Sequence, residues 1–204
     1  MKIKADFICF HFALPSICTI FALNKNNMKI AVFCSANSDI APEYFERTAE
    51  LGRWAARNGH TVVFGGCNLG LMECVAKATR QAGGRTIGVV PKIIERGGKM
   101  SDEIDVVIPC DSLSDRKDLM VAQCDVAVAL PGGIGTLDEI FTVAASACIG
   151  YHSKRVVLYD IGGFWQPLVK MLDAMAAQGM IRGDWHRLIS VAKDINEIEE
   201  EVKK

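Results

Sequence analysis

The sequence lacks a surplus of charge of either sign, because its 204 residues include 23 lysines and arginines against 24 acidic residues. No basic stripe or charge run is present, which argues against a protein that binds along a nucleic-acid backbone. Histidine is scarce, with four residues and no HExxH motif, and no Cys/His spacing suits zinc. We therefore expect neither a nucleic-acid partner nor a bound metal, whereas a small anionic ligand held by a few local groups fits the composition.

Disulfide patterns are also missing. The chain has eight cysteines, yet they form no CxxC pair and no evenly spaced framework. Most of them lie within apolar runs, as reduced cysteines do in the cores of cytosolic proteins. This usage predicts a cytoplasmic protein with free thiols.

Residues 1–27 differ from the rest of the chain. An apolar segment, 5–23, follows two lysines and loosely resembles a signal peptide. It has no clear small-residue cleavage site, and three residues interrupt it: Asp6, His11 and Pro15. A regular strand pattern begins only at a second methionine, Met28. We therefore expect 1–27 to be an extension outside the fold and expect no membrane partner, with a membrane anchor as the alternative interpretation.

From Met28 onward, short apolar runs alternate with longer stretches of helical period. The expected strands are 29–35, 60–66, 85–91, 103–110, 125–131, 154–160 and a short one near 188–191. The expected helices are 41–59, 69–84, 112–124, 135–150, 162–180 and 195–204. Such alternation, with nearly continuous apolar strands, predicts a parallel sheet with helices on both faces. We therefore predict a single α/β domain, 28–204, built on a doubly wound, Rossmann-like sheet.

Three turns that directly follow expected strands can carry polar groups: 34–39, 65–70 and 131–138. In doubly wound sheets, ligands bind beyond the carboxyl ends of the strands, at the point where the strand order reverses. We therefore expect these turns to form the ligand site.

Two of these turns are rich in glycine, GGCNLG (65–70) and PGGIGT (131–136). Glycine lets backbone N–H groups approach an anion, and the helix that follows adds the positive end of its dipole. Neither turn fits the dinucleotide fingerprint or the P-loop, whose Lys-Ser/Thr pair is replaced by Leu71 and Met72. The pattern favours a phosphate-bearing ligand and no cofactor. Tight strand–helix packing is the alternative explanation for either turn taken alone.

These motifs, in this order, resemble one family. PGGIGTLDE (131–139) is similar to PGGxGTxxE, the signature of the Lonely Guy (LOG) family of cytokinin riboside 5′-monophosphate phosphoribohydrolases. DSLSDRK (111–117) resembles the family's second motif with its Arg-Lys pair, and FGGCNLGLM (64–72) resembles its GGGxxGLM loop. The resemblance covers about 28–192. Some relatives carry a lysine decarboxylase label, but nothing in the sequence suggests a pyridoxal phosphate site.

The resemblance implies a homodimeric hydrolase that cleaves the N-glycosidic bond of a nucleoside 5′-monophosphate, giving free base and ribose 5-phosphate. It implies catalytic roles for Arg116 and Glu139, whose carboxylate would stabilise an oxocarbenium-like transition state. The implied substrate- and phosphate-binding residues are Gly65, Gly66, Lys117, Gly132, Gly133, Gly135 and Thr136. Asp138, about 100° around the helix from Glu139, is expected to point elsewhere.

Departures from the family pattern spare the phosphate and catalytic motifs and bear on the expected base pocket. The first turn reads CSAN (34–37) instead of CGSS, Cys67 and Glu73 replace glycines, and SACIG (146–150) replaces WAQLG. The base is therefore left open between a cytokinin and a plain purine, as in AMP. A non-catalytic carrier of a nucleotide or phosphorylated cofactor is the alternative function. Retention of both catalytic-type residues disfavours it, because a carrier needs only the glycine turns.

Overall fold

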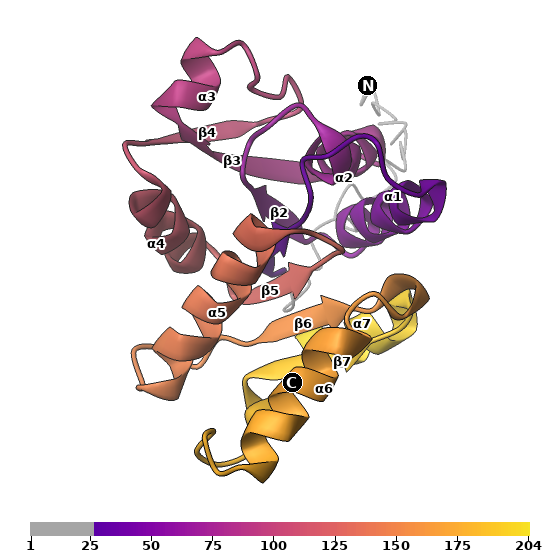
Figure 1. Ribbon diagram of the computed structural model, residues 1–204. Helices are drawn as coiled ribbons and strands as arrows, with labels where there is room; N and C mark the ends of the chain where they lie inside the picture. Colours follow the sequence, from indigo (N-terminus) through magenta and orange to yellow (C-terminus); the bar gives the residue numbers. More distant parts are fainter. Residues whose placement is uncertain (1–26) are drawn as a thin grey trace, which may run out of the picture.

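The computed structural model describes residues 27–204, which form a seven-stranded sheet flanked by helices (Figure 1). Neighbouring strands are parallel throughout. The strands are β1 (Lys29–Phe33), β2 (Thr61–Phe64), β3 (Arg85–Pro91), β4 (Val106–Cys110), β5 (Val126–Ala129), β6 (Val156–Tyr159) and β7 (Ile189–Ala192). The predicted parallel α/β sheet is confirmed. The expected extension, 1–27, lies outside the described residues except for its last position.

Helices connect the strands in the expected alternation. They are α1 (Pro42–Arg57), α2 (Gly70–Gln81), α3 (Lys92–Arg96), α4 (Leu113–Gln123), α5 (Ile134–Cys148), α6 (Gln166–Ala177) and α7 (Ile195–Val202). Only α3 was missed, because five residues between Pro91 and Gly97 are too few to show a helical period. Within 27–204, no helix combines the length and apolarity needed to cross a bilayer.

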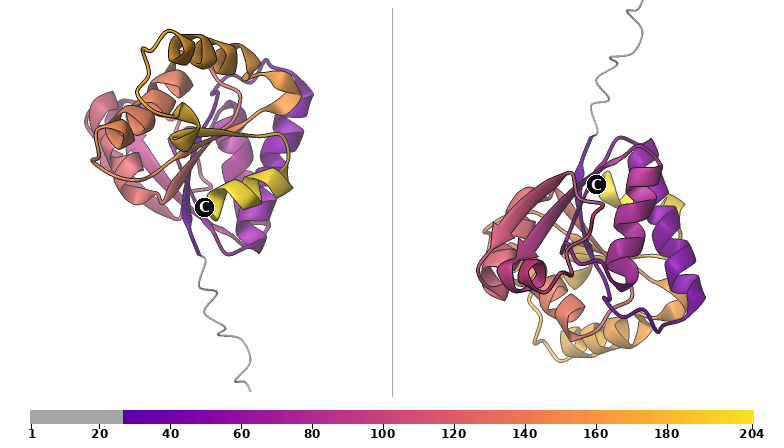
Figure 2. Two further views of the ribbon diagram at one scale, coloured as in Figure 1. Left: turned by 90° about the horizontal axis from the view of Figure 1, so that it is seen from below. Right: turned by 90° about the horizontal axis from the view of Figure 1, so that it is seen from above.

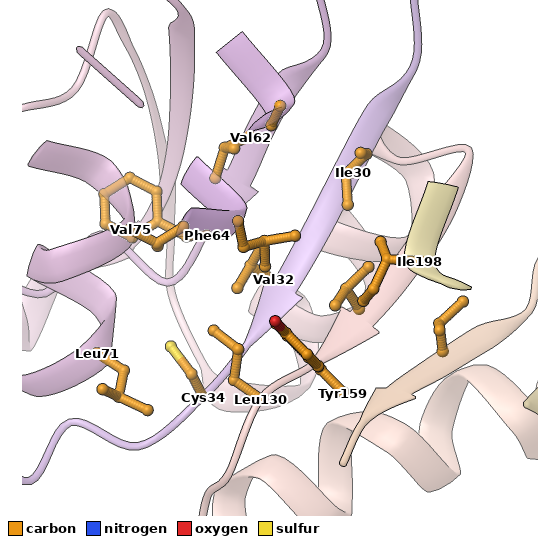
Figure 3. Close-up of a cluster of buried hydrophobic side chains, with 14 of the residues drawn as sticks. Ile30, Val32, Cys34, Val62, Phe64, Leu71, Val75, Leu130, Tyr159 and Ile198 are labelled. Atoms are coloured by element: carbon orange, nitrogen blue, oxygen red, sulfur yellow. The ribbon is translucent and has the colours of Figure 1, made fainter. Parts of the chain in front are cut away.

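Both faces of the sheet are apolar, since helices cover each of them. In β1, Ile30 and Val32 point to the face covered by α1, α2 and α7, whereas Ala31 and Phe33 point to the face covered by α4, α5 and α6. Figure 3 shows the first of these cores, where Leu71 of α2 lies beside Cys34, the residue that follows β1. The views in Figure 2 show the resulting three layers, helix, sheet and helix.

The strand order, β4-β3-β2-β1-β5-β6-β7, reverses between β1 and β5. These two strands pair in parallel and end level with each other, with Phe33 opposite Ala129. A hydrogen bond of 3.2 Å from the Ser35 amide to the Pro131 carbonyl joins the turns that follow them. The fold therefore brings together two of the three turns expected to form the site, at the one place where doubly wound sheets bind ligands.

Candidate active site

A cavity of about 300 Å³ lies at this reversal of strand order. Its walls come from the turn after β1, from the start of α5, and from one residue each of α2 and α4. The lining residues are Cys34, Ser35, Ala36, Met72, Arg116, Gly133, Gly135, Thr136 and Glu139. Five of them were expected site residues: Arg116, Gly133, Gly135, Thr136 and Glu139. The other four expected residues, Gly65, Gly66, Lys117 and Gly132, are not part of this lining.

The glycine turn before α5 leaves backbone donors free. The first N–H groups of an α-helix have no partner within the helix, and Gly133, which immediately precedes α5, offers no side chain to cap them; no such cap is found among residues 27–204. A Cβ atom at Gly133 or Gly135 would meet no heavy atom of the described chain within 4 Å. Packing therefore does not require glycine at these two positions. The open space beside these amides, at the positive end of a helix, is suited to an anion.

Gly132 has a different role from the two glycines after it. A Cβ atom at this position would lie 2.1 Å from the Thr136 hydroxyl oxygen. Gly132 therefore makes room for Thr136, a buried residue whose side chain lines the cavity. The turn thus combines open amides with a hydroxyl that can also bond an anion.

Arg116 and Glu139 form a buried ion pair in the cavity wall. The Arg116 Nη2 donates to Glu139 Oε1 at 3.1 Å, and the two side chains are 14% and 9% exposed. Gly65, just after β2, permits this arrangement, because a Cβ atom there would lie 2.0 Å from Nη2. The Arg116 Nε is buried as well and has no hydrogen-bond partner among residues 27–204. The site therefore holds a fixed guanidinium with donor capacity left over.

Burial raises the pKa of Glu139 from 4.5 to about 7. Desolvation is the largest cause, and the Asp138 charge adds to it, while the Arg116 and Lys117 charges act in the opposite direction. Near neutral pH this carboxyl group therefore exchanges readily between its protonated and ionised forms. Perturbation of this kind, in a cavity and against a specific charged partner, is typical of functional sites.

Lys117 and Asp138 form a second ion pair beside the first. The Lys117 Nζ donates to both Asp138 oxygens, at 2.7 and 2.8 Å. Asp138 points away from the cavity, as expected, and its side chain is 53% exposed. The ammonium group of Lys117 is thus directed to Asp138 in this structure, and the expected role of Lys117 in binding substrate stays a prediction.

The second glycine turn is explained by close packing. Gly66 has a φ of +73°, and a Cβ atom there would lie 2.5 Å from the Val90 side chain. Gly70 has a φ of +57° and would bring its Cβ to 2.5 Å from the backbone of Ala36. The packing alternative thus fits this turn, whereas the turn before α5 keeps its amides open.

Four lining residues were not singled out from the sequence: Cys34, Ser35, Ala36 and Met72. The turn that contains the first three was expected near the site, but no spacing rule identified them as lining residues. Burial raises the pKa of the Cys34 thiol well above its usual value, so this side chain is neutral. Together these residues give the cavity one wall without formal charge.

The fold and the cavity define a class: a Rossmann-like α/β protein whose strand-order reversal carries a glycine turn with open amides and a buried carboxylate–guanidinium pair. A family profile described as "Possible lysine decarboxylase" matches residues 72–202. The cytokinin riboside 5′-monophosphate phosphoribohydrolase of Mycobacterium tuberculosis is 36% identical over 74% of this chain and 81% of its own. The probable cytokinin riboside 5′-monophosphate phosphoribohydrolase LOGL9 of rice (Oryza sativa subsp. japonica) is 35% identical over 81% and 73%. The chain therefore belongs to this family, the LOG family.

The chain also resembles a solved structure of a protein that is named as a carrier. The Moco carrier protein of Chlamydomonas reinhardtii superimposes with a TM-score of 0.68 at 28% identity, over 87% of this chain and 96% of its own. The shared fold is thus found in proteins named as enzymes and in proteins named as carriers, so the site must distinguish the two.

Proposed function

We propose that the protein hydrolyses the N-glycosidic bond of a nucleoside 5′-monophosphate, releasing free base and ribose 5-phosphate. The observation that carries this proposal is the buried Arg116–Glu139 pair in the same cavity as the open amides of α5. The relatives named as phosphoribohydrolases support the same activity.

The 5′-phosphate would lie at the start of α5. The backbone N–H groups beside Gly133 and Gly135 would donate to it, together with the Thr136 hydroxyl, and the helix dipole would add to the attraction. No side chain need move, because the space beside both glycines is already open. This placement leaves the ribose to extend toward Glu139, one helical turn further along.

Glu139 would act at the anomeric carbon of the ribose. As the C1′–N bond breaks, its electron pair goes to the base and positive charge builds on C1′ and the ring oxygen. Ionised Glu139 would stabilise that charge and accept a proton from the water that adds to C1′. The departing base takes up a proton from solvent, and Glu139 then releases the proton of the attacking water to solvent, so nucleotide plus water gives base plus ribose 5-phosphate. Arg116 would hold the carboxylate in place and offer its free donor to substrate.

A carrier function is the second candidate, favoured by the likeness to the Moco carrier protein. A carrier could use the same amides to hold a phosphorylated ligand. It would have no evident use for a carboxylate whose burial opposes ionisation and which an arginine holds in the cavity wall. For this reason we favour the enzymatic function over the carrier function.

We propose a 6-aminopurine as the released base, either plain, as in AMP, or substituted, as in a cytokinin. The test is incubation of the purified protein with AMP, N6-isopentenyl-AMP, GMP, CMP and UMP, with base and ribose 5-phosphate both quantified. We expect equimolar products from the two adenine nucleotides. Adenosine is the matched control, and we expect its kcat/KM to be at least about 100-fold lower, because it lacks the group that the turn binds.

Absence of base release from every nucleotide, together with tight binding of one of them, would favour the carrier instead. Equal kcat/KM values for AMP and adenosine would contradict the phosphate-binding role of the turn.

We further propose that the protein is a cytoplasmic homodimer. Exposed apolar side chains gather on α5, α6 and the turns that follow them, where single chains seldom leave so much apolar surface. They are Phe141, Ile149, Tyr151, Met171, Met175 and Met180. Light scattering on the eluting protein should give twice the chain mass. Changing Met171 and Met175 to glutamate should halve it, whereas the same change at exposed Ile93 of α3 should not.

We also propose that residues 28–204 fold and act as one domain without the preceding segment. The first strand begins at Lys29, and the Met28 amide already donates to the buried His60 ring at 3.2 Å. A chain that starts at Met28 should match the full chain in unfolding midpoint and in kcat/KM. A loss of either quantity would assign a role to 1–27.

A further inference from the structure

We propose that Lys117 and Asp138 form a clamp between α4 and α5 that keeps Arg116 and Glu139 in their catalytic arrangement, and that Lys117 is not a substrate ligand. This inference rests on the proposed function of the same site. It assigns Lys117 and Asp138 as positioning residues, because they would act through their neighbours.

The first observation is a doubled connection between the same two helices. Arg116 and Lys117 are adjacent in α4, and their partners Glu139 and Asp138 are adjacent in α5. Adjacent helical residues diverge by about 100°, so the two pairs leave the helices in different directions and together restrict rotation. The outer pair has the closer contacts, at 2.7 and 2.8 Å, against 3.1 Å for the inner pair.

The second observation is that α4 has few buried side chains to fix it. Met120 is the one buried residue of this helix, whereas α2, of similar length, has seven buried residues. The strand before α4, β4, lies at the edge of the sheet, and both Val106 and Val107 in it are exposed. With one buried side chain and two partly buried ones, Leu119 and Val121, α4 has less apolar packing than α2, so polar contacts contribute more to its exact position. Arg116 depends on α4 in turn.

The third observation is that the ammonium group of Lys117 is already engaged, because two of its three N–H donors are directed to Asp138. Both Asp138 oxygens accept from its ammonium group, and its side chain is only 21% exposed. It does not line the cavity, although Arg116 beside it does. Reaching a phosphate at the start of α5 would require Lys117 to leave an existing ion pair.

The clamp would also influence the ionisation of the Glu139 carboxyl group. The charged groups that act on this carboxylate are Arg116 and Lys117 from α4 and Asp138 from α5. Cys34 faces it from the end of β1 as a neutral thiol. Lys117 balances Asp138, so the pair adds little net charge while both members are present. Removal of one member unbalances the site, and the direction depends on which one is removed.

The test is a double-mutant cycle with Lys117→Met, Asp138→Asn and the combined variant, assayed with AMP. Each single change should lower kcat about fivefold to tenfold, and the combined change should lower it no further, because either substitution already opens the clamp. The dissociation constant for ribose 5-phosphate, measured by calorimetry, should stay within about twofold throughout. Lys117→Arg should retain most of the kcat. The matched control is the exposed Arg47–Glu50 pair on α1, where Arg47→Met and Glu50→Gln should change nothing.

A pH profile separates this role from a merely structural one. Lys117→Met should move the midpoint of the kcat/KM profile to higher pH, since Glu139 loses a nearby cation. Asp138→Asn should move it to lower pH, since Glu139 loses a nearby anion. Midpoints that coincide in the two variants would contradict the electrostatic part of the clamp.

Two outcomes would overturn the clamp itself. If Lys117→Met weakens ribose 5-phosphate binding tenfold or more while Asp138→Asn does not, Lys117 binds the phosphate. If the effects of the two single changes multiply in the combined variant, they act independently. Should the wild-type protein release no base at all, the proposed function fails, but the same cycle on ribose 5-phosphate affinity and unfolding midpoints still decides between clamp and ligand.

Discussion

The helix pair α1–α2 and the helix pair α4–α5 are held together by different physical means. Between α1 and α2 the backbones approach closely, since a Cβ atom at Gly52 would lie 2.8 Å from the Val75 carbonyl oxygen. Between α4 and α5 the described contacts include two ion pairs, and α4 adds a single buried side chain. One pair is therefore built for close apolar packing, while the other keeps charges near a cavity.

This difference separates stability from chemistry. Close packing fixes the frame of the sheet and tolerates no added atoms. The charged pair lies where a carboxylate has to remain ionisable, at a cost in desolvation that packing elsewhere offsets. Substitutions in the α1–α2 pair and in the α4–α5 pair should therefore have different effects, and each of the following experiments tests this difference.

The largest effect on activity should come from Glu139→Gln. The change keeps the shape of the side chain and removes the charge that stabilises the transition state, so kcat should fall about 100-fold or more. Affinity for ribose 5-phosphate should change little. Steady-state kinetics and calorimetry measure the two quantities, and Glu50→Gln on α1 serves as the control.

Stability should respond to the same change with a definite sign. The folded-state pKa of Glu139 lies above its ordinary value, so the native protein holds this proton more tightly than the unfolded chain does. The contribution to stability is therefore fully present below about pH 4.5, and it is lost progressively as pH rises from 4.5 through the folded-state pKa of about 7. The Glu139→Gln variant should lack this loss, and its unfolding midpoint relative to wild type should rise from pH 4.5 to about pH 7 and level off above that. A difference that stays constant with pH would contradict the buried, ionisable state.

In the closely packed α1–α2 pair, Gly52→Val should lower the stability of the protein and leave its activity unchanged. Its side chain would collide with the backbone of α2, and we expect a loss of about 2–3 kcal/mol in the free energy of unfolding. Below the unfolding transition, kcat and KM should equal those of wild type. A Gly52→Val variant with a normal unfolding transition but a low kcat would show that packing between α1 and α2 affects the site between α4 and α5.

Gly65→Ala should affect both activity and stability, each to a smaller extent. The new methyl group would displace the Arg116 guanidinium from its present position. We expect kcat to fall about tenfold, because a catalytic pair misplaced by a fraction of an ångström loses much of its effect. The unfolding midpoint should shift by only a few degrees, as measured by calorimetry. A normal kcat would mean that Arg116 has another workable position.

The sequence predicted the fold well because periodicity reports burial, and the alternation of strands and helices determines a parallel sheet. It predicted Arg116 and Glu139 as site residues because they occur within spaced motifs. It did not predict the partner of Lys117, since adjacency to Arg116 says nothing of where a flexible side chain ends. Nor could it distinguish the two glycine turns. Glycines that are needed for packing, such as Gly66, and glycines that face the cavity, such as Gly133, look alike in the sequence until their neighbours are placed.

The most direct test of the account is the pH dependence of kcat/KM for AMP, which reports ionisations of the free enzyme and of the free substrate. The account predicts a limb that rises with pH, has its midpoint near 7 and is absent from Glu139→Gln. A limb that persists in that variant belongs to the substrate phosphate. A wild-type profile that is flat from pH 5.5 to 8.5, or one that falls as pH rises through 7, would contradict the claim that ionised Glu139 carries the reaction.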